Sequence, residues 1–205
     1  MFISKKKYNP LILVFLTIIS IILLSYFKFS FNNKTDLFNN FEILHNGDLI
    51  LRCGRSADSF VAYTADKDAE FTHIGIVVFE NNFPKIIHAV PHKGKLLKKE
   101  TIDEFLNPKN TSKFAIYRGN FPSETLQNVT TEISNFYNAK IVFDNNYDLK
   151  TDDEMYCTEL ILKAFKNTNI NLNIKPKEFD YLFGKQLIIF PSQFTKLPFK
   201  KVNMN

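Results

Sequence analysis

HIGIVVF at residues 73–79 and KIIHAV at residues 85–90 stand on either side of the pair Asn81-Asn82. Both stretches are rich in β-branched residues, which favour strands, and paired Asn residues suit a tight turn. The sequence therefore predicts a buried hairpin. In a tight hairpin, a residue near the start of one strand faces a residue near the end of the next. We therefore expect His73 and His88 to lie close together.

Further strands and helices are predicted on both sides of this hairpin. Strands are expected at residues 48–52, 95–100, 114–118 and 187–190, where apolar and β-branched residues follow turn signals. Helices are expected at 56–65 with Ser56 as N-cap, at 123–139 with Ser123 as N-cap, at 155–166, and as a short turn from Pro191. Strands that cluster in the middle, with helices flanking them, predict an α+β domain with a mainly antiparallel sheet.

Composition and charge exclude several classes of protein. The chain has 205 residues, 45% of them hydrophobic, which is enough for one packed core. Of the 26 Lys and Arg residues, four lie in Met1–Phe31, which contains no acid, and the remaining 22 face 21 Asp and Glu residues. The rest of the chain therefore lacks the basic footprint of a nucleic-acid-binding protein. No nucleotide-binding loop, metal-ligand spacing or cofactor motif occurs, so we expect no metal and no cofactor.

The N-terminal region predicts a membrane anchor. Leu11–Phe27 reads LILVFLTIISIILLSYF and carries no charge. As a helix it would span about 26 Å, enough for a thin bilayer. Lysines at residues 5–7 precede it, which places residues 1–10 in the cytoplasm and sends the rest across the membrane. No small-x-small cleavage site follows, which favours an uncleaved anchor over a signal peptide. We therefore expect a tail at 1–10, a single-pass anchor at 11–27, a linker at 28–40, and an extracytoplasmic domain at 41–205, in the periplasm or at the cell surface.

Cys157 lies at the predicted N-terminus of the helix at 155–166, behind Asp152 and Asp153. Unpaired backbone N–H groups and the positive end of the helix dipole stabilise a thiolate at such a position. The same N–H groups can hold a tetrahedral oxyanion. An imidazole suits the accompanying proton transfer, and the hairpin supplies His73 as base with His88 to orient it. His45 and His92 fall in loops. The alternatives are a small buried Cys and structural histidines.

The order of motifs resembles a known family. Along the chain we find GDLI at 47–50, GRS at 54–56, THIGIV at 72–77, IHAV at 87–90, YD at 147–148 and YCTEL at 156–160. This series, over about residues 41–202, resembles the permuted NlpC/P60 proteins, the YiiX/YaeF-like papain-fold amidases. In the permuted branch the His strand precedes the nucleophile helix, as it does here.

The resemblance implies a circularly permuted papain-like (NlpC/P60) fold and assigns roles to residues. It implies Cys157 as nucleophile, His73 as base and His88 at the third polar position, where many permuted members carry Glu. Tyr156 either lines the substrate pocket or packs in the core, and we assign it to substrate binding. Glu159 is expected to cap its helix or to form a buried ion pair, and Asp48 to anchor a turn. A disulfide between Cys53 and Cys157 would abolish the nucleophile, and we do not expect one.

The expected function is therefore a thiol hydrolase that cleaves amide bonds through an acyl-enzyme on Cys157. Peptidoglycan stem peptides are one expected substrate class, given the extracytoplasmic location and the amide bonds that NlpC/P60 relatives cut. One alternative is a lipid acyltransferase or phospholipase that uses the same Cys-His site. The other is a non-catalytic binding module on the same fold. The expected partners are thus a small amide, a peptide or a lipid, together with the membrane that holds the N-terminal helix.

Overall fold

The computed structural model describes residues 19–20, 43–91, 96–181, 184–196 and 198–203. The chain divides into two compact units, residues 1–42 and 43–205, and the fold described below is that of the second unit. Apart from residues 19–20, the predicted tail, anchor and linker lie outside the described residues. Among the residues described, no helix has the length and apolar character needed to cross a bilayer.

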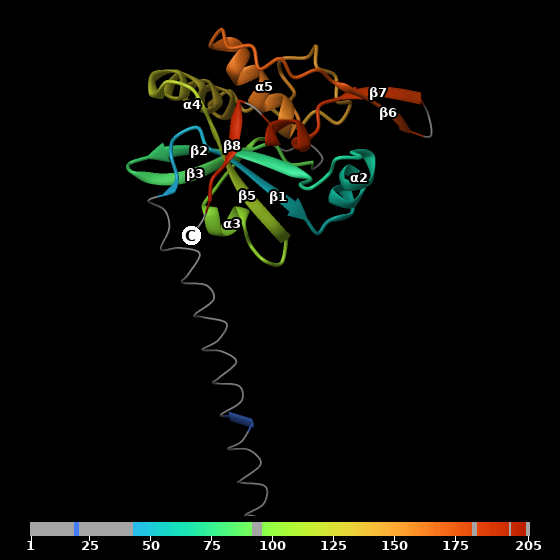
Figure 1. Ribbon diagram of the computed structural model, residues 1–205, viewed down its shortest axis with the longest axis horizontal. Helices are drawn as coiled ribbons and strands as arrows, with labels where there is room; N and C mark the ends of the chain where they lie inside the picture. The colour runs from blue at the N-terminus through green and yellow to red at the C-terminus, as the bar shows by residue number, and fades with distance from the viewer. Residues whose placement is uncertain (1–18, 21–42, 92–95, 182–183, 197, 204–205) are drawn as a thin grey trace, which may run out of the picture. The chain divides into compact units, whose positions relative to one another are not determined.

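The second unit is built on a six-stranded antiparallel sheet with strand order β4-β3-β2-β1-β5-β8 (Figure 1). The strands are β1 (Leu49–Gly54), β2 (His73–Glu80), β3 (Phe83–His88), β4 (Lys98–Glu100), β5 (Thr111–Gly119) and β8 (Phe199–Lys201). A separate two-stranded hairpin consists of β6 (Lys177–Tyr181) and β7 (Gly184–Ile188). The predicted α+β class with an antiparallel sheet flanked by helices is confirmed.

The hairpin predicted from the sequence supplies two inner strands of the sheet, β2 and β3. Ile76 pairs with Ile87 across β2 and β3, and Asn81 and Asn82 close the turn with φ angles of 51° and 67°. Positive φ at both central residues is the signature of the tight turn whose twist matches that of two antiparallel strands.

Each face of the sheet is covered by helices (Figure 1). Alternate residues of a strand point to opposite faces, so Leu49 and Leu51 join one apolar cluster and Ile50 joins the other. The larger cluster includes Val129 of α4 (Ser123–Asn138) and Leu160 of α5 (Cys157–Asn167). The smaller cluster is closed by α3 (Ile102–Phe105), whose Ile102 and Phe105 are buried. The sheet thus separates a larger hydrophobic core, on the side of α4 and α5, from a smaller one on the side of α3.

The short helix α2 (Ala57–Ala65) is of a different kind. Ser56 is its N-cap and accepts a hydrogen bond from the backbone N–H of Ser59, as predicted. The helix buries none of its side chains, and Phe60, Val61 and Tyr63 are exposed. Figure 1 shows it beyond the end of β1. The helix α4, in contrast, has Pro122 at its N-cap with no side-chain cap, so the predicted capping by Ser123 is wrong. Ser123 is instead the first residue inside the helix.

The C-terminal part departs most from the prediction. The strand expected at 187–190 is the end of β7, and its partner β6 was not predicted. The last strand β8 was not predicted either, whereas the helical turn from Pro191 is present as the 3-10 helix η2 (Pro191–Thr195). Short strands such as β6 and β8 carry no sustained alternation of apolar and polar residues, so sequence patterns do not reveal them.

Asp48 anchors the start of β1, as expected. Its carboxylate oxygens accept hydrogen bonds from Nε and Nη2 of Arg118 at 2.8 Å each, and from the backbone N–H of His45 at 2.8 Å. The carboxylate is buried but fully paired, so it fixes the turn before β1 and ties it to β5.

Candidate active site

Cys157 is the first residue of α5, so its thiol lies beside backbone N–H groups that have no partner within the helix. The backbone N–H groups of Ile74, Thr158 and Cys157 itself lower the pKa of this thiol, and the charge of Arg52 acts in the same direction. Ile74 belongs to β2 and follows His73, and the pairing of β2 with β3 begins only at Ile76. The thiol therefore lies against the first part of the strand that carries His73, a part that pairs with β1 but not with β3.

The net shift of the thiol corrects the sequence-based expectation. Burial raises the pKa of Cys157 to about 11, and this outweighs the N–H groups and Arg52. Cys157 is nevertheless not sealed off, since the residue retains some exposure to solvent. At neutral pH the resting residue is therefore a neutral thiol, and the helix N-terminus does not hold a preformed thiolate as the sequence suggested.

His73 and His88 lie together, as the hairpin predicted. Nε2 of His73 is 2.8 Å from Nδ1 of His88, and both side chains are buried. The register offsets them, because Ile76 pairs with Ile87 and His88 is therefore a diagonal neighbour of His73. Burial lowers the pKa of His73 well below 6.5, and burial also lowers the pKa of His88. Both imidazoles are accordingly neutral at pH 7.

Glu100 is the residue that sequence reasoning missed. Its Oε2 is 3.0 Å from Nε2 of His88, and its Oε1 is 3.1 Å from Nζ of Lys98. The hydrogen bond with His88 holds the pKa of Glu100 down at about 2. Glu100 is the last residue of β4, and Lys98, two residues earlier, pairs with His88 of β3. Residues two apart in a strand lie on the same face, and this alternation is the only sequence signal that could have placed Glu100 on the side of His88.

These contacts determine which nitrogen of each ring carries the proton. The Glu100 carboxylate can only accept, so Nε2–H of His88 donates to it. A neutral His88 then offers a lone pair at Nδ1, and Nε2–H of His73 donates to that atom. A neutral His73 is left with its lone pair at Nδ1. The relay Glu100–His88–His73 thus leaves Nδ1 of His73 as the basic atom.

Phe105 supports this relay from α3. Its ring centroid lies 4.8 Å from that of His88 and 5.8 Å from that of His73. Gly75 makes room for the ring, because a Cβ atom there would lie 2.5 Å from Cγ2 of Ile86 and 3.2 Å from the Phe105 ring. The glycine of the THIGIV motif is therefore required for close packing beside the two histidines.

Tyr156 lies in the core rather than on a surface that substrate could contact. It is 2% exposed, and its hydroxyl accepts a hydrogen bond from the backbone N–H of Ile189 at 3.1 Å. Its ring packs on Tyr147 with centroids 5.1 Å apart. The structure therefore supports the packing alternative, and the substrate-binding assignment of Tyr156 is not retained.

Glu159 has the structural surroundings that were expected of it. Its Oε2 accepts from the backbone N–H of Tyr156 at 3.2 Å, and its Oε1 is 3.0 Å from Nζ of Lys163. It caps α5 and forms a buried ion pair there. Burial raises its pKa to about 7, against the opposing effect of Lys163.

The remaining candidates lie apart from the relay. Cys53 and Cys157 are both free thiols, so the structure contains no disulfide between them. His92 lies outside the described residues, and His45 contributes its backbone N–H to Asp48. The described part of the chain contains no group of three or more His, Cys, Asp and Glu side chains suited to a metal ion.

The chain is similar to known proteins in sequence and in fold. A family model described as "Permuted papain-like amidase enzyme, YaeF/YiiX, C92 family" matches residues 43–185. A solved structure with the same fold is the crystal structure of metalloprotein yiiX from Escherichia coli O157:H7. It has a TM-score of 0.63 at 19% identity and covers 78% of this chain and 97% of the other. No curated protein matches the chain.

Proposed function

This chain belongs to the permuted papain-like amidase family, a family of cysteine amide hydrolases, and from that premise we propose a mechanism and a set of catalytic residues. Cys157 is the nucleophile, His73 is the general base and acid, and His88 with Glu100 positions His73. The observation that carries this assignment is the relay, because it leaves the lone pair of His73 at Nδ1.

The reaction begins from the neutral pair. Nδ1 of His73 takes the thiol proton while the sulfur attacks the carbonyl carbon of the amide, and a tetrahedral oxyanion forms. Backbone N–H groups at the start of α5 stabilise that oxyanion. His73 then returns the proton to the leaving amine as the C–N bond breaks, which leaves a thioester on Cys157. Water, deprotonated by the same nitrogen, hydrolyses the thioester and restores the thiol.

The relay stabilises the charge that His73 gains in this reaction. When His73 becomes an imidazolium, its Nε2–H still donates to His88, whose other nitrogen is bound to the Glu100 carboxylate. The negative charge of Glu100 thus acts on His73 through a neutral imidazole. The arrangement also prevents rotation of either ring. A rotated His73 ring would present its N–H to the sulfur in place of the unprotonated Nδ1.

The substrate class follows from location and surface. We propose that residues 11–27 anchor the chain in a membrane and that the domain acts outside the cytoplasm, on amide bonds such as those of peptidoglycan stem peptides. A lipid substrate is the second candidate. It is favoured by three exposed apolar side chains on α2, those of Phe60, Val61 and Tyr63. The helix α2 begins close to the site, because the backbone N–H of Gly54, three residues before the helix, donates to the side chain of Thr72, the neighbour of His73.

The assignment is tested by the alkylation of Cys157 with iodoacetamide between pH 5 and pH 11. We use the full-length chain with Cys53→Ser, so that Cys157 is the one thiol that the reagent can alkylate. A thiol with a pKa of about 11 is almost fully protonated at pH 7, so rapid reaction there requires a base. We expect His73→Ala to slow the reaction at pH 7 by about 100-fold, the scale of general base catalysis. The matched control is His45→Ala, which removes a histidine outside the relay.

Two results would count against the proposal. Equal rates for the parent protein and His73→Ala at pH 7 would show that His73 is not the base. Reaction of the parent protein only near pH 11 would leave an inert buried thiol, and the binding module would then be the better description of this chain.

A further inference from the structure

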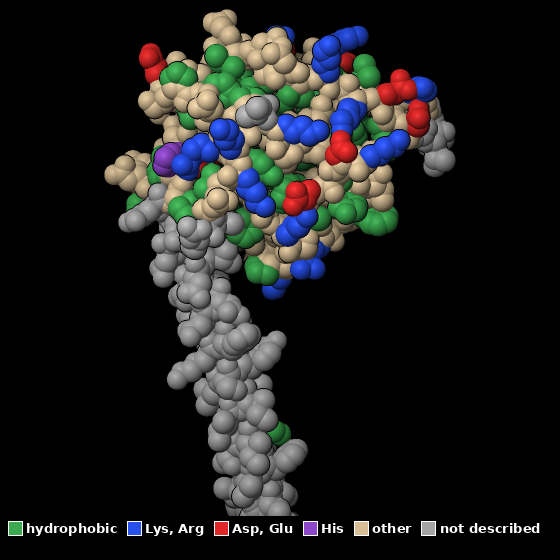
Figure 2. All heavy atoms as spheres, viewed as in Figure 1, with side chains coloured by type: hydrophobic (Ala, Val, Ile, Leu, Met, Phe, Trp, Pro, Cys, Tyr) green, Lys and Arg blue, Asp and Glu red, His purple; other side chains and the backbone are tan. Residues whose placement is uncertain are grey.

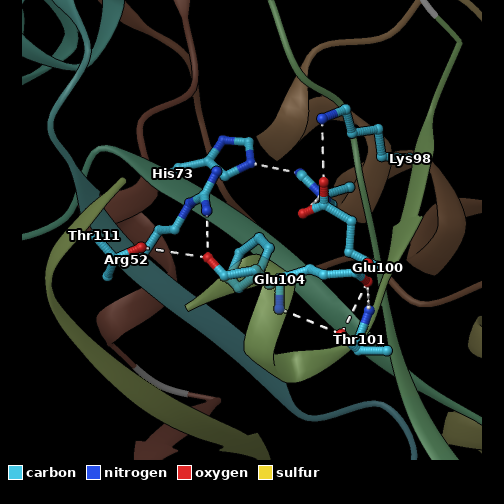
Figure 3. A network of polar contacts seen from close by, with 9 residues as sticks. Arg52, His73, Lys98, Glu100, Thr101, Glu104 and Thr111 are labelled. Atoms are coloured by element: carbon cyan, nitrogen blue, oxygen red, sulfur yellow. Dashed lines mark hydrogen bonds and ion pairs between the residues drawn. The ribbon is translucent and has the colours of Figure 1, made fainter. Parts of the chain in front are cut away.

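Arg52 lies beside the proposed catalytic residues but takes no part in the relay. It pairs with His73 in the register between β1 and β2. Its guanidinium carbon lies 4.4 Å from the centroid of the Phe105 ring, and Nη1 donates to the backbone oxygen of Phe105. Figure 3 shows the Arg52 side chain next to the His73 ring. The guanidinium is thus held in a fixed position at the site.

This cation lacks a counter-charge within the described part of the chain. Arg52 forms no ion pair there, and its Nε is buried without an acceptor. Glu100, whose charge Arg52 does feel, is already bound to His88 and Lys98. Arg118 shows the usual arrangement, since two of its nitrogens bind the Asp48 carboxylate. A half-buried charge with no charged partner is costly, so its position at the site indicates a function.

The position of Arg52 indicates what that function is. Its charge acts on the Cys157 thiol and on the His73 ring, so it lies within electrostatic range of the reacting atoms. A guanidinium offers a planar set of N–H donors that matches a carboxylate, and the Phe105 ring and carbonyl hold it in place for such a contact.

We propose that Arg52 binds a carboxylate that the substrate carries close to the scissile amide. The inference rests on the function proposed above and sharpens it, because it selects an anionic, peptide-like amide over a neutral lipid amide. Arg52 is then a residue for substrate specificity, and it would lower the KM for carboxylate-bearing amides.

A pair of alkylating reagents tests the site without knowledge of the natural substrate. Iodoacetate carries a carboxylate next to the reacting carbon, and iodoacetamide is its neutral counterpart. We measure the second-order rate of each reagent with Cys157 at pH 7, in the full-length Cys53→Ser chain, and form the iodoacetate-to-iodoacetamide ratio. The variants are Arg52→Gln, Arg52→Lys and the matched control Arg55→Gln, which removes an exposed arginine whose Nε donates to the carbonyls of Pro108 and Thr111.

We expect Arg52→Gln to lower the ratio by about tenfold or more, the scale of a lost charge-assisted hydrogen bond. Arg52→Lys keeps the charge without the paired donors, so we expect a smaller fall, and Arg55→Gln should leave the ratio unchanged. An unchanged ratio in Arg52→Gln would overturn the carboxylate site while iodoacetamide still reports a competent thiol. If the ratio falls equally in Arg52→Gln and Arg55→Gln, the cause is the general surface charge, and the proposed carboxylate site is also overturned. If neither reagent reacts with Cys157 at pH 7, the proposed function fails and the carboxylate site fails with it.

Discussion

Two carboxylates in this domain, the half-buried Glu100 and the buried Glu159, have pKa values shifted in opposite directions, and their difference separates a proposed functional group from a structural one. Glu100 binds a neutral imidazole, and that hydrogen bond keeps its pKa at about 2. Glu159 binds Lys163 and a backbone N–H, yet burial raises its pKa to about 7. A search for a carboxyl group whose pKa is shifted towards neutral pH would select Glu159. Geometry selects Glu100, because of these two carboxylates only Glu100 is linked through His88 to His73, the proposed base.

Closeness to Cys157 in sequence would, taken alone, favour the same error, although Glu159 was expected to cap its helix or to form an ion pair. Glu159 stands two residues after Cys157 in the YCTEL motif, whereas Glu100 lies in KKE, a stretch with no motif character. The carboxylate next to the proposed nucleophile in sequence caps a helix, and the carboxylate far from it in sequence binds His88, which contacts the proposed base. A perturbed pKa is therefore an indication of function only when the group is also connected by hydrogen bonds to the reacting atoms.

The sharpest test of this contrast is a matched pair of amide substitutions. Glu100→Gln should slow the alkylation of Cys157 by iodoacetamide at pH 7 by about 10- to 100-fold, part of the effect of the base itself. The Gln amide can donate to Nε2 of His88, which would reverse both tautomers and place N–H at Nδ1 of His73. Glu159→Gln should change the rate less than about twofold, because Glu159 does not contact the relay.

Nitrogen chemical shifts of the imidazoles distinguish a change of tautomer from a general loosening of structure. In the parent protein, Nδ1 of His73 should show the shift of an unprotonated nitrogen, and in Glu100→Gln it should show that of an N–H. If Glu159→Gln slows the reaction as much as Glu100→Gln does, the contrast between the two carboxylates is wrong.

Gly75→Ala tests how tightly the relay depends on packing. The new methyl group would lie 2.5 Å from Cγ2 of Ile86 and 3.2 Å from the Phe105 ring, so one of them must move. Overpacking of this kind costs about 1–3 kcal/mol of unfolding free energy. Thermal unfolding should show a lower Tm, and the alkylation rate of Cys157 should fall as Phe105 displaces the histidines. A full alkylation rate in a destabilised variant would show that Phe105 does not position the rings.

The smallest expected effect is a pair of opposite pH dependences of stability. The pKa of Glu100 is lowered, so its contribution is present above pH 4.5 and is lost as pH falls towards 2. The pKa of Glu159 is raised, so stability falls as pH rises from 4.5 to 7. Each change amounts to about 1–2 kcal/mol after allowance for partial solvent screening. Urea unfolding across pH should show that Glu100→Gln removes the acidic slope and that Glu159→Gln removes the other slope. Identical slopes in both variants would contradict the assignment.

The parts of the fold that the sequence predicted are those with local causes. The β-branched runs and the Asn81-Asn82 turn predicted the β2–β3 hairpin, and the hairpin brought His73 and His88 together without further information. The helix α5 followed from the helical spacing of its apolar residues, although it begins at Cys157, two residues after the predicted start at residue 155. These features depend on neighbours within a few residues in sequence.

The features that were missed depend on contacts between distant segments. Glu100 reaches His88 only because β4 pairs with β3. The raised pKa of Cys157 arises because the folded domain buries its thiol, and no property of the helix terminus alone predicts it. Tyr156 precedes the nucleophile but contacts Ile189, a residue far along the chain. Motif spacing carries no information about such burial.

The outer strands of the sheet also decide how the molecule behaves in concentrated solution. An exposed strand edge is a template on which another chain can add a strand, the first step of fibril growth and of strand exchange between copies. Here both outermost strands, β4 and β8, are only three residues long, and each carries two lysines. Short, charged edges discourage such addition. The strand that carries Glu100 thus also protects the protein against aggregation.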